Sequence, residues 1–197
     1  MPWGAISNMG YNTHYPILAA CVARTTGPIL ELGCGESSTP MLHLMAHAMK
    51  RRLHSVDTDP AWLKKYDGYY QADHSFEIVA PHGDDALPLV TRQIEGWRRW
   101  LTSDMANIGN LGVVFVDCAP GEARHMIASF FARRAQIVLC HDSEKDYAAG
   151  GNYMYDQCIP EFKYVSEWRR WRPYTLILSN FLETPIDACD QVWEPPK

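Results

Sequence analysis

One short stretch, residues 27–40 (GPILELGCGESSTP), constrains the fold more than any other part of the chain. Its apolar start has the length of a strand, and the chain then turns through Gly33 and Gly35, which can adopt a positive φ without a Cβ clash. A helix is predicted to follow at once, with Thr39 as its N-cap and Pro40 as its first residue. A strand, a glycine turn and a helix in this order form half of a βαβ unit, in which free backbone N–H groups and the helix dipole face a ligand.

The spacing of the two glycines narrows the choice of ligand. A dinucleotide-binding turn has the pattern G-x-G-x-x-G/A, but the sixth position of this pattern is Ser38 here. A phosphate-binding P-loop has a Lys directly after its last glycine, and no Lys follows Gly35 within reach. The stretch therefore excludes a P-loop and disfavours an NAD(P)-binding Rossmann oxidoreductase, which is kept as an alternative.

The composition fits one globular domain. The 197 residues are 47% hydrophobic and 21% charged, and no apolar run approaches the roughly 18 residues of a membrane span. We expect an N-terminal arm and helix (residues 1–26), a core (27–181) and an irregular tail (182–197). The six cysteines are scattered and form no C-x-x-C pair, which indicates reduced thiols and a cytoplasmic location.

The net charge of −5 bears on partners. Domains that bind a phosphate backbone usually present a basic face, so nucleic acid is disfavoured as a partner, and no segment indicates a membrane. We therefore expect a small-molecule substrate. The seven tryptophans could fill a core or the face of a homodimer.

The order of predicted elements defines the fold class. Helices are predicted at 13–24 (with Thr13 as N-cap), 41–50, 61–66, 89–101 and 122–134. Strands are predicted at 29–32, 51–57, 74–80, 111–117 and 135–140, followed by an antiparallel hairpin of strands 162–168 and 174–180. This order predicts an α/β fold with a Rossmann-like, doubly wound, mostly parallel seven-stranded sheet, a C-terminal antiparallel hairpin and three α/β/α layers. His43 and His47 are predicted to be exposed on their helix.

The segment Glu31-Leu32-Gly33-Cys34-Gly35 resembles the E/D-x-G-x-G turn of the class I S-adenosylmethionine-dependent methyltransferases, which have a Rossmann-like sheet. The resemblance extends strand by strand from Gly27 to Phe181, and the C-terminal hairpin distinguishes this family from dinucleotide-binding dehydrogenases. It implies that the turn packs under the methionyl part and the ribose of S-adenosylmethionine. The turn residues implied in cofactor binding are Glu31, Gly33, Cys34, Gly35, Ser37 and Ser38, where Ser37 replaces the usual third glycine.

Acidic residues follow several of the predicted strands. A carboxylate after the second strand can accept both hydroxyls of a ribose, so we assign this role to Asp57, and helix capping to Asp59. After the third strand, the resemblance implies that an acid accepts the exocyclic amine of adenine. Asp84 and Asp85 stand in tandem there, and the choice between them is open.

The ends of the fourth and fifth strands carry the candidate catalytic groups. Asp117 and Asp142 resemble, in place, the carboxylate ligands of the Mg²⁺-dependent O-methyltransferases such as catechol O-methyltransferase, which implies Mg²⁺ as a further cofactor. Asp117 is also placed beside the S-adenosylmethionine cofactor. The chain lacks the Lys that serves some members of the family as base, so His141 is preferred over His125 in that role. Alternatively, Asp142 only caps a turn.

These observations predict O-methylation of a small hydroxylated molecule. The Asn/Asp-Pro-Pro-Tyr/Phe turn that is typical of nucleic-acid amino-methyltransferases is replaced by Asp117-Cys118-Ala119-Pro120. A non-catalytic S-adenosylmethionine-binding or scaffold protein stays open as a further alternative. We expect residues 1–26 and 145–160 to determine the acceptor, with His14 and Tyr15 either lining the site or lying on a helix surface.

Overall fold

The computed structural model describes residues 12–103, 108–144 and 153–184. These residues contain one seven-stranded sheet with the order β3-β2-β1-β4-β5-β7-β6. Strands β1 to β5 run parallel, whereas β7 is antiparallel to both β5 and β6. The strands are β1 Ile29–Leu32, β2 Leu53–Asp57, β3 His74–Ile78, β4 Leu111–Val116, β5 Ala135–His141, β6 Tyr164–Trp168 and β7 Thr175–Ser179. The predicted sheet and its C-terminal hairpin are confirmed.

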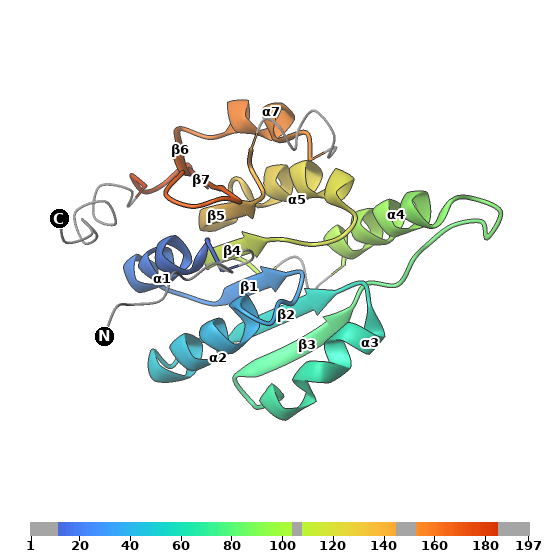
Figure 1. Cartoon of the computed structure of the whole chain (residues 1–197), viewed down its shortest axis with the longest axis horizontal. Coiled ribbons are helices and arrows are strands. Elements are labelled where there is room, and N and C mark those ends of the chain that lie inside the picture. The colour runs from blue at the N-terminus through green and yellow to red at the C-terminus, as the bar shows by residue number, and fades with distance from the viewer. Residues whose placement is uncertain (1–11, 104–107, 145–152, 185–197) are drawn as a thin grey trace, which may run out of the picture.

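Helices cover both faces of this sheet (Figure 1). The α-helices are α1 Tyr15–Arg24, α2 Ser38–Ala48, α3 Pro60–Leu63, α4 Leu89–Leu101, α5 Arg124–Phe131 and α7 Tyr155–Cys158, and the 3-10 helices are η1 Lys64–Tyr69, η2 Gly121–Ala123 and η3 Ile159–Glu161. Apolar side chains of α4, α5 and α7 form one core cluster with one side of the strands, and those of α1 and α2 form a second cluster with the other side. The two clusters confirm the three predicted layers.

The strand register brings the candidate site residues to one edge. Leu32 at the end of β1 lies opposite Val56 of β2 and Val116 of β4, and Val116 lies opposite Cys140 of β5. The residues that follow these positions therefore leave the sheet at the same level. This is the carboxyl edge of the parallel strands, where open α/β sheets bind ligands.

The starts of two helices differ from the predictions. Helix α2 begins at Ser38, so Thr39 lies inside the helix instead of capping it, and Ser37 occupies the N-cap position without a side-chain cap bond. The reason is a tertiary contact: the Thr39 hydroxyl donates a hydrogen bond to the buried Glu31 carboxylate, 3.0 Å away. Helix α1 begins at Tyr15 and has His14 at its N-cap, so the prediction for Thr13 was also wrong.

Other local predictions had mixed outcomes. Helix α4 has the predicted bounds, and the Asp59 carboxylate caps α3 by accepting from the N–H groups of Ala61 and Trp62. His47 is exposed as predicted. His43 is buried instead, because its ring packs between those of Tyr69 and His74, with centroids 4.8 and 5.2 Å away.

Some predictions fall on parts of the chain that are not described. The predicted arm and most of the tail lie outside the described residues, as does half of the 145–160 segment. None of the helices in the described parts combines the length and apolar character that a bilayer-spanning helix needs.

Candidate functional site

The bend after β1 packs directly against the end of β4. Gly33 has a φ of +96°, and a Cβ atom built there would lie 2.4 Å from the carbonyl oxygen of Asp117. A side chain at this position would therefore be strained by its backbone conformation and would collide with the neighbouring strand. The glycine lets the first bend and Asp117 lie next to each other at the carboxyl edge.

The N–H groups of this bend are used inside the protein. Gly33 donates to the carbonyl of Val56 (2.8 Å), Cys34 donates to Oδ2 of Asp57 (2.8 Å), and Gly35 donates to the hydroxyl of Thr39 (3.0 Å). The expectation that free N–H groups face a ligand was therefore wrong for these three residues. The bend is held in shape by its neighbours and does not form an anion-binding nest.

Asp57 lies against the bend, where its sequence position predicts it. Its two carboxylate oxygens accept from the N–H groups of Cys34 and Asp59, at 2.8 and 2.9 Å. Burial raises the pKa of Asp57, while these backbone hydrogen bonds act in the opposite direction. Each carboxylate oxygen has a second lone pair, so the group can still accept hydrogen bonds from a ligand.

Glu31 supports the bend from within the core. Its carboxylate is fully buried and accepts from the hydroxyls of Thr39 and Ser55, the latter at 2.6 Å. Burial raises the pKa of Glu31 to about 7. Ser38 is buried as well. Its side chain hydrogen-bonds Glu31, so these two predicted cofactor-binding residues support the bend from the buried side.

Two further predicted contacts lie at the rim or away from the bend. The backbone carbonyl of Ser37 accepts a hydrogen bond from the Tyr15 hydroxyl at 2.5 Å, and its side chain hydrogen-bonds Asn12. Asp84 and Asp85 are exposed, on a connection that extends away from the sheet (Figure 1). There Asp84 accepts from the N–H of Ala86 at 2.9 Å, so the adenine contact assigned to this pair stays a prediction.

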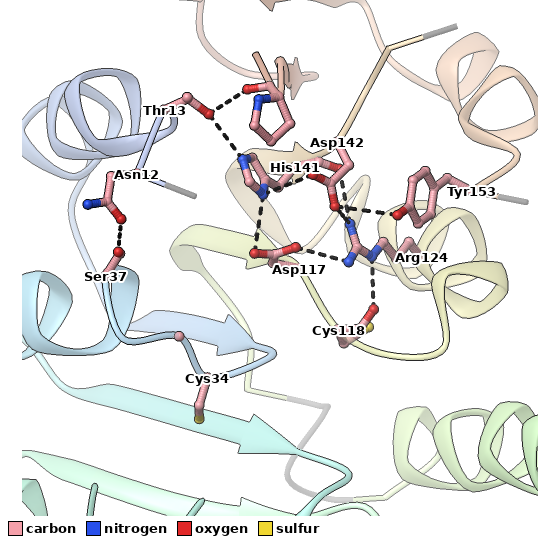
Figure 2. A network of polar contacts seen from close by, with 12 residues as sticks. Asn12, Thr13, Cys34, Ser37, Asp117, Cys118, Arg124, His141, Asp142 and Tyr153 are labelled. Carbon is pink, nitrogen blue, oxygen red and sulfur yellow. Dashed lines mark hydrogen bonds and ion pairs between the residues drawn. The ribbon is translucent and has the colours of Figure 1, made fainter. Parts of the chain in front are cut away.

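A second polar cluster lies at the ends of β4 and β5 and is centred on a buried arginine. Figure 2 shows the guanidinium of Arg124 between the carboxylates of Asp117 and Asp142, with 2.9 Å to an oxygen of each. Arg124 also donates to the carbonyls of Cys118 (2.8 Å) and His141 (3.1 Å). Burial lowers the pKa of Arg124, but nearby acidic groups outweigh it, so the pKa lies well above its ordinary value.

His141 completes the cluster and is 2% exposed. Its Nδ1 lies 3.3 Å from Asp117 and 3.4 Å from Asp142, and its Nε2 lies 3.3 Å from the Thr13 hydroxyl (Figure 2). Burial lowers the pKa of His141, but the hydrogen bond and charge of Asp117 and the charge of Asp142 raise it above the ordinary value. Both ring nitrogens contact protein partners, which does not favour the predicted role of a base that meets substrate.

The cluster also tests whether the chain fits a resident Mg²⁺. Ligand atoms of Asp117, His141 and Asp142 lie within 4.8 Å of one another. However, each carboxylate has one oxygen against Arg124 and the other against His141. A divalent cation would have to displace the guanidinium that already neutralises both acids. The described residues therefore do not fit a resident Mg²⁺, and no step below depends on one.

The start of the first helix brings His14 to this cluster. His14 is 2% exposed, and its ring centroid lies 4.7 Å from that of His141 and 4.9 Å from that of Phe115. Burial, followed by the charge of His141, lowers the pKa of His14 to about 3, so the ring is neutral at pH 7. His14 therefore faces the cluster, and Tyr15 is half-buried and reaches the rim of the bend, where its hydroxyl donates to the Ser37 carbonyl.

Sequence reasoning missed Arg124. It lies on the same face of α5 as the buried residues Ile127, Ala128 and Phe131. A single arginine at a position that the apolar periodicity assigns to the core is a usable signal, because such a charge needs a buried partner. His125, the other predicted base, lies outside the cluster and is only partly buried.

A cavity of about 640 Å³ opens beside Asp142, between the end of β5, α7 and the β6–β7 hairpin. Tyr153 lines it, and its hydroxyl lies 3.5 Å from Asp142. A Cβ atom at Gly121 would lie 2.2 Å from the Tyr153 ring, so this glycine makes room for the tyrosine. The carboxyl edge therefore combines a glycine bend with Asp57, an arginine-bridged acid pair, and an adjacent cavity.

No protein-family profile matches this chain, and no curated protein matches its sequence. Similar solved structures include monomeric WbdD (12% identity over 85% of this chain and 39% of that chain, TM-score 0.46), the METTL16 MTase domain (14%, 84% and 65%, TM-score 0.49) and the human methyltransferase 10 domain containing protein (14%, 86% and 80%, TM-score 0.43). This chain spans less than two thirds of the first two. With TM-scores below 0.5, these structural similarities do not identify the activity of this chain.

Proposed function

We propose that this chain is an S-adenosylmethionine-dependent methyltransferase that methylates a hydroxyl group of a small molecule. The observation that carries the proposal is the contact between the Asp57 carboxylate and the N–H of Cys34 at the carboxyl edge. This contact supports the proposal, because it holds beside the glycine bend a carboxylate that could accept two ribose hydroxyls. The antiparallel β7 supports this proposal over the oxidoreductase alternative.

The residues that would hold the cofactor are the bend, residues 33–35, and Asp57. Bound S-adenosylmethionine supplies a methyl group on a positively charged sulfur. The protein contributes mainly by holding donor and acceptor in line, which is the largest available effect for such a displacement. The fixed bend and the buried Glu31 beneath it provide this rigidity.

A hydroxyl acceptor must also lose a proton. Asp142 lines the cavity and is held by Arg124 and His141. Each of its carboxylate oxygens keeps a second lone pair, unlike the ring nitrogens of His141, so Asp142 can accept this proton. Asp117 and His141 position Arg124 and Asp142. In this proposal Asp142 is the group that meets the acceptor, while His141 acts through it.

The cavity supports a small molecule as the partner. Its lining contains one basic residue, Arg169, and four acidic residues, Asp142, Glu144, Asp156 and Glu167. This excess of acidic residues would repel the phosphates of a nucleic acid. A homodimer and a cytoplasmic location stay predictions.

Methyl transfer from labelled S-adenosylmethionine to a panel of phenols and sugars tests the proposal. Asp57→Asn should raise the KM for S-adenosylmethionine at least 10-fold, and Asp142→Asn should lower kcat by about 100-fold or more, as expected for loss of a proton acceptor. Asp67→Asn, at an exposed residue of η1, is the matched control and should change neither constant.

Metal removal belongs to the same experiment. Because Arg124 occupies the position between the two acids, EDTA should leave the rate unchanged. A protein that binds S-adenosylmethionine but transfers no methyl group to any acceptor would favour the non-catalytic alternative. A protein that binds NAD and not S-adenosylmethionine would contradict the proposal.

A further inference from the structure

A line of buried polar side chains runs from the buried side of the glycine bend to helix α2 and the edge strand β3. The Ser55 hydroxyl lies 2.6 Å from Oε2 of Glu31 and 3.0 Å from Nε2 of His74. Nδ1 of His74 lies 3.0 Å from Nδ1 of His43 on α2. Glu31 and Ser55 are fully buried, whereas His74 is 1% exposed and His43 is 9% exposed. The line therefore leads from a sealed carboxyl group toward solvent.

The two histidines are held in this line and differ in their surroundings. The His43 ring packs against Tyr69 of η1, with centroids 4.8 Å apart. Burial, followed by the charge of His43, lowers the pKa of His74 to about 4, while the charge of Asp73 acts in the opposite direction and that of His54 in the same one. The His74 ring is therefore neutral at pH 7 and carries one hydrogen, on either Nδ1 or Nε2.

Counting hydrogens leaves two arrangements of the line. The Ser55 hydroxyl has a single hydrogen, and two facing Nδ1 atoms bond only when one of them carries a hydrogen and the other does not. If Glu31 is ionised, it accepts from Ser55, which accepts from Nε2 of His74. Nδ1 of His74 then accepts from His43. If Glu31 is protonated, it donates to Ser55, and each bond of the line runs the opposite way. The tautomer of His74 therefore follows the charge of Glu31.

The groups around Glu31 allow both charge states near neutral pH. Burial raises its pKa to about 7, and the charge of Asp57 acts in the same direction. Cys34 and Tyr66 also interact with Glu31, and burial raises the pKa of each far enough that both are neutral. The opposing hydrogen bonds come from three hydroxyl groups, those of Ser38, Thr39 and Ser55.

We propose that this line is a proton relay, which carries a proton between Glu31 and solvent at His43. In one passage, the proton of Glu31 moves to the Ser55 oxygen, and the Ser55 hydroxyl proton moves to Nε2 of His74. The Nδ1 proton of His74 moves to Nδ1 of His43, which releases its Nε2 proton to solvent. Ser55, His74 and His43 each gain one proton and lose one, so only Glu31 changes its charge.

The relay also couples the bend to pH. This coupling rests on the proposed function, whereas the relay itself does not. The sulfur that carries the methyl group of S-adenosylmethionine is positively charged, so its presence at the bend would favour the ionised form of Glu31. Because an acid with a pKa of about 7 is half protonated at pH 7, binding should release up to about half a proton. The uncharged sulfur of S-adenosylhomocysteine should release less.

NMR of the histidine rings in isotope-labelled protein tests the relay. In the wild type the hydrogen of His74 should lie on Nδ1 at pH 5 and on Nε2 at pH 8. Ser55→Ala should abolish this change because it removes the link to Glu31, and Glu31→Gln should abolish it because the acid no longer titrates. Ser75→Ala is the matched control, since this hydroxyl lies 2.8 Å from Nδ1 of His54 and its loss should leave the change at His74 intact.

The exit to solvent is tested at the other end of the line. His43→Phe keeps a ring against Tyr69 but accepts no proton, so exchange between the two charge states of Glu31 should slow. The NMR signal of the labelled Glu31 carboxyl carbon should then broaden or split near pH 7. His47→Phe, one turn further along α2 at an exposed position, should leave the single averaged signal of the wild type.

Several results would overturn the relay. One is a His74 tautomer that is the same at pH 5 and pH 8 in the wild type, and another is a change that survives in Ser55→Ala. A sharp averaged carboxyl signal in His43→Phe would refute the exit at His43. The wild-type result needs no variant, so it stands even where a substitution unfolds the chain.

Calorimetry in two buffers of different ionisation enthalpy counts the protons that binding releases. The wild type should release more protons with S-adenosylmethionine than with S-adenosylhomocysteine, and Glu31→Gln should release equal numbers. Equal release in the wild type would refute the coupling. A tautomer change at His74 without binding of either compound would support the relay and refute the methyltransferase proposal. Binding of both compounds without a tautomer change would refute the relay alone.

Discussion

Replacing Arg124 by Met removes the cation that separates Asp117 from Asp142. The guanidinium side chain is 9% exposed and lies 2.9 Å from each carboxylate. Methionine has a similar length but no charge and no N–H groups. The variant therefore leaves two part-buried acids that face each other, with only His141 between them.

The expected loss of stability follows from this burial. Removing one partner of a buried ion pair typically costs about 3–5 kcal/mol. With an m value of about 2 kcal/mol per M urea, the unfolding midpoint should fall by about 1.5–2.5 M. Arg98→Met is the matched control, because Arg98 pairs with Glu95 on an exposed face of α4 and its side chain is 59% exposed. An exposed pair of this kind contributes at most about 0.5 kcal/mol.

The pH dependence sharpens this test. Burial raises the pKa of Asp117, but Arg124 and His141 outweigh it and hold the pKa below its ordinary value of 3.8. A lowered pKa stabilises the fold above pH 3.8, and this contribution is lost as the pH falls through the folded value. Without Arg124 the pKa of Asp117 should rise above 3.8. As the pH falls, Asp117 should therefore be protonated earlier in the variant than in the wild type, which removes the repulsion between the two acids.

Urea unfolding at pH 7 and pH 4.5, followed by tryptophan fluorescence, measures both effects. The gap between the wild type and Arg124→Met should be smaller at pH 4.5. The double variant Arg124→Met/Asp142→Asn should recover part of the loss, because it removes one of the two facing charges. A midpoint within about 0.3 M of the wild type at pH 7, or a gap that does not narrow, would refute the reasoning.

Three further changes test other parts of the structure. Burial raises the pKa of Glu31 from 4.5 to about 7. Its contribution to the free energy of unfolding is therefore complete below pH 4.5, and about 3 kcal/mol of it is lost as the pH rises through 7. Glu31→Gln should flatten the resulting decline in urea midpoint between pH 5 and 8, and an unaltered decline would contradict this explanation. Gly33→Ala should lower the thermal midpoint by at least about 5 °C, because of its positive φ and the 2.4 Å approach to Asp117, whereas Gly68→Ala, with no atom within 4 Å, should change it little. Asp59→Ala should cost about 1 kcal/mol in urea unfolding through loss of the α3 cap, and a neutral effect would show that the cap contributes nothing.

The sheet was predictable because its strands carry their own signals. The continuous apolar run 111–116 became β4, whose six residues are all buried between two helical layers. The convergence of Asp57 and Asp117 on one edge followed from the parallel order of the strands. Local patterning and chain order therefore determine the edge at which the candidate site lies.

The start of α2 could not be predicted in the same way. Residues 36–39 (ESST) offer three hydroxyl side chains that could cap a helix. The choice depends on Glu31, whose buried carboxylate takes the Thr39 hydroxyl and so draws this residue into the first turn. No local preference encodes a contact with a residue eight positions earlier in another element.

The roles of the residues in the acid cluster could not be predicted from the sequence either. The positions of His141 at the end of β5 and of Asp142 directly after it predicted chemistry at this strand end. Which of them can meet a substrate depends on the partners of each atom, and both nitrogens of His141 contact the protein. The position of Arg124 between the two acids makes the site an ion-paired cluster instead of the predicted metal site. The sequence indicated this arginine only as a charged residue on the apolar face of a helix.

Titration of the isotope-labelled protein with S-adenosylhomocysteine, followed by amide NMR, tests the central claim most directly. We expect the largest shifts at residues 33–35 and at Asp57. The amino-terminal edge of the sheet has a small cavity of about 160 Å³ near Arg52, which should not respond. Saturating ligand without shifts at the bend, or with shifts confined to the edge near Arg52, would contradict the account.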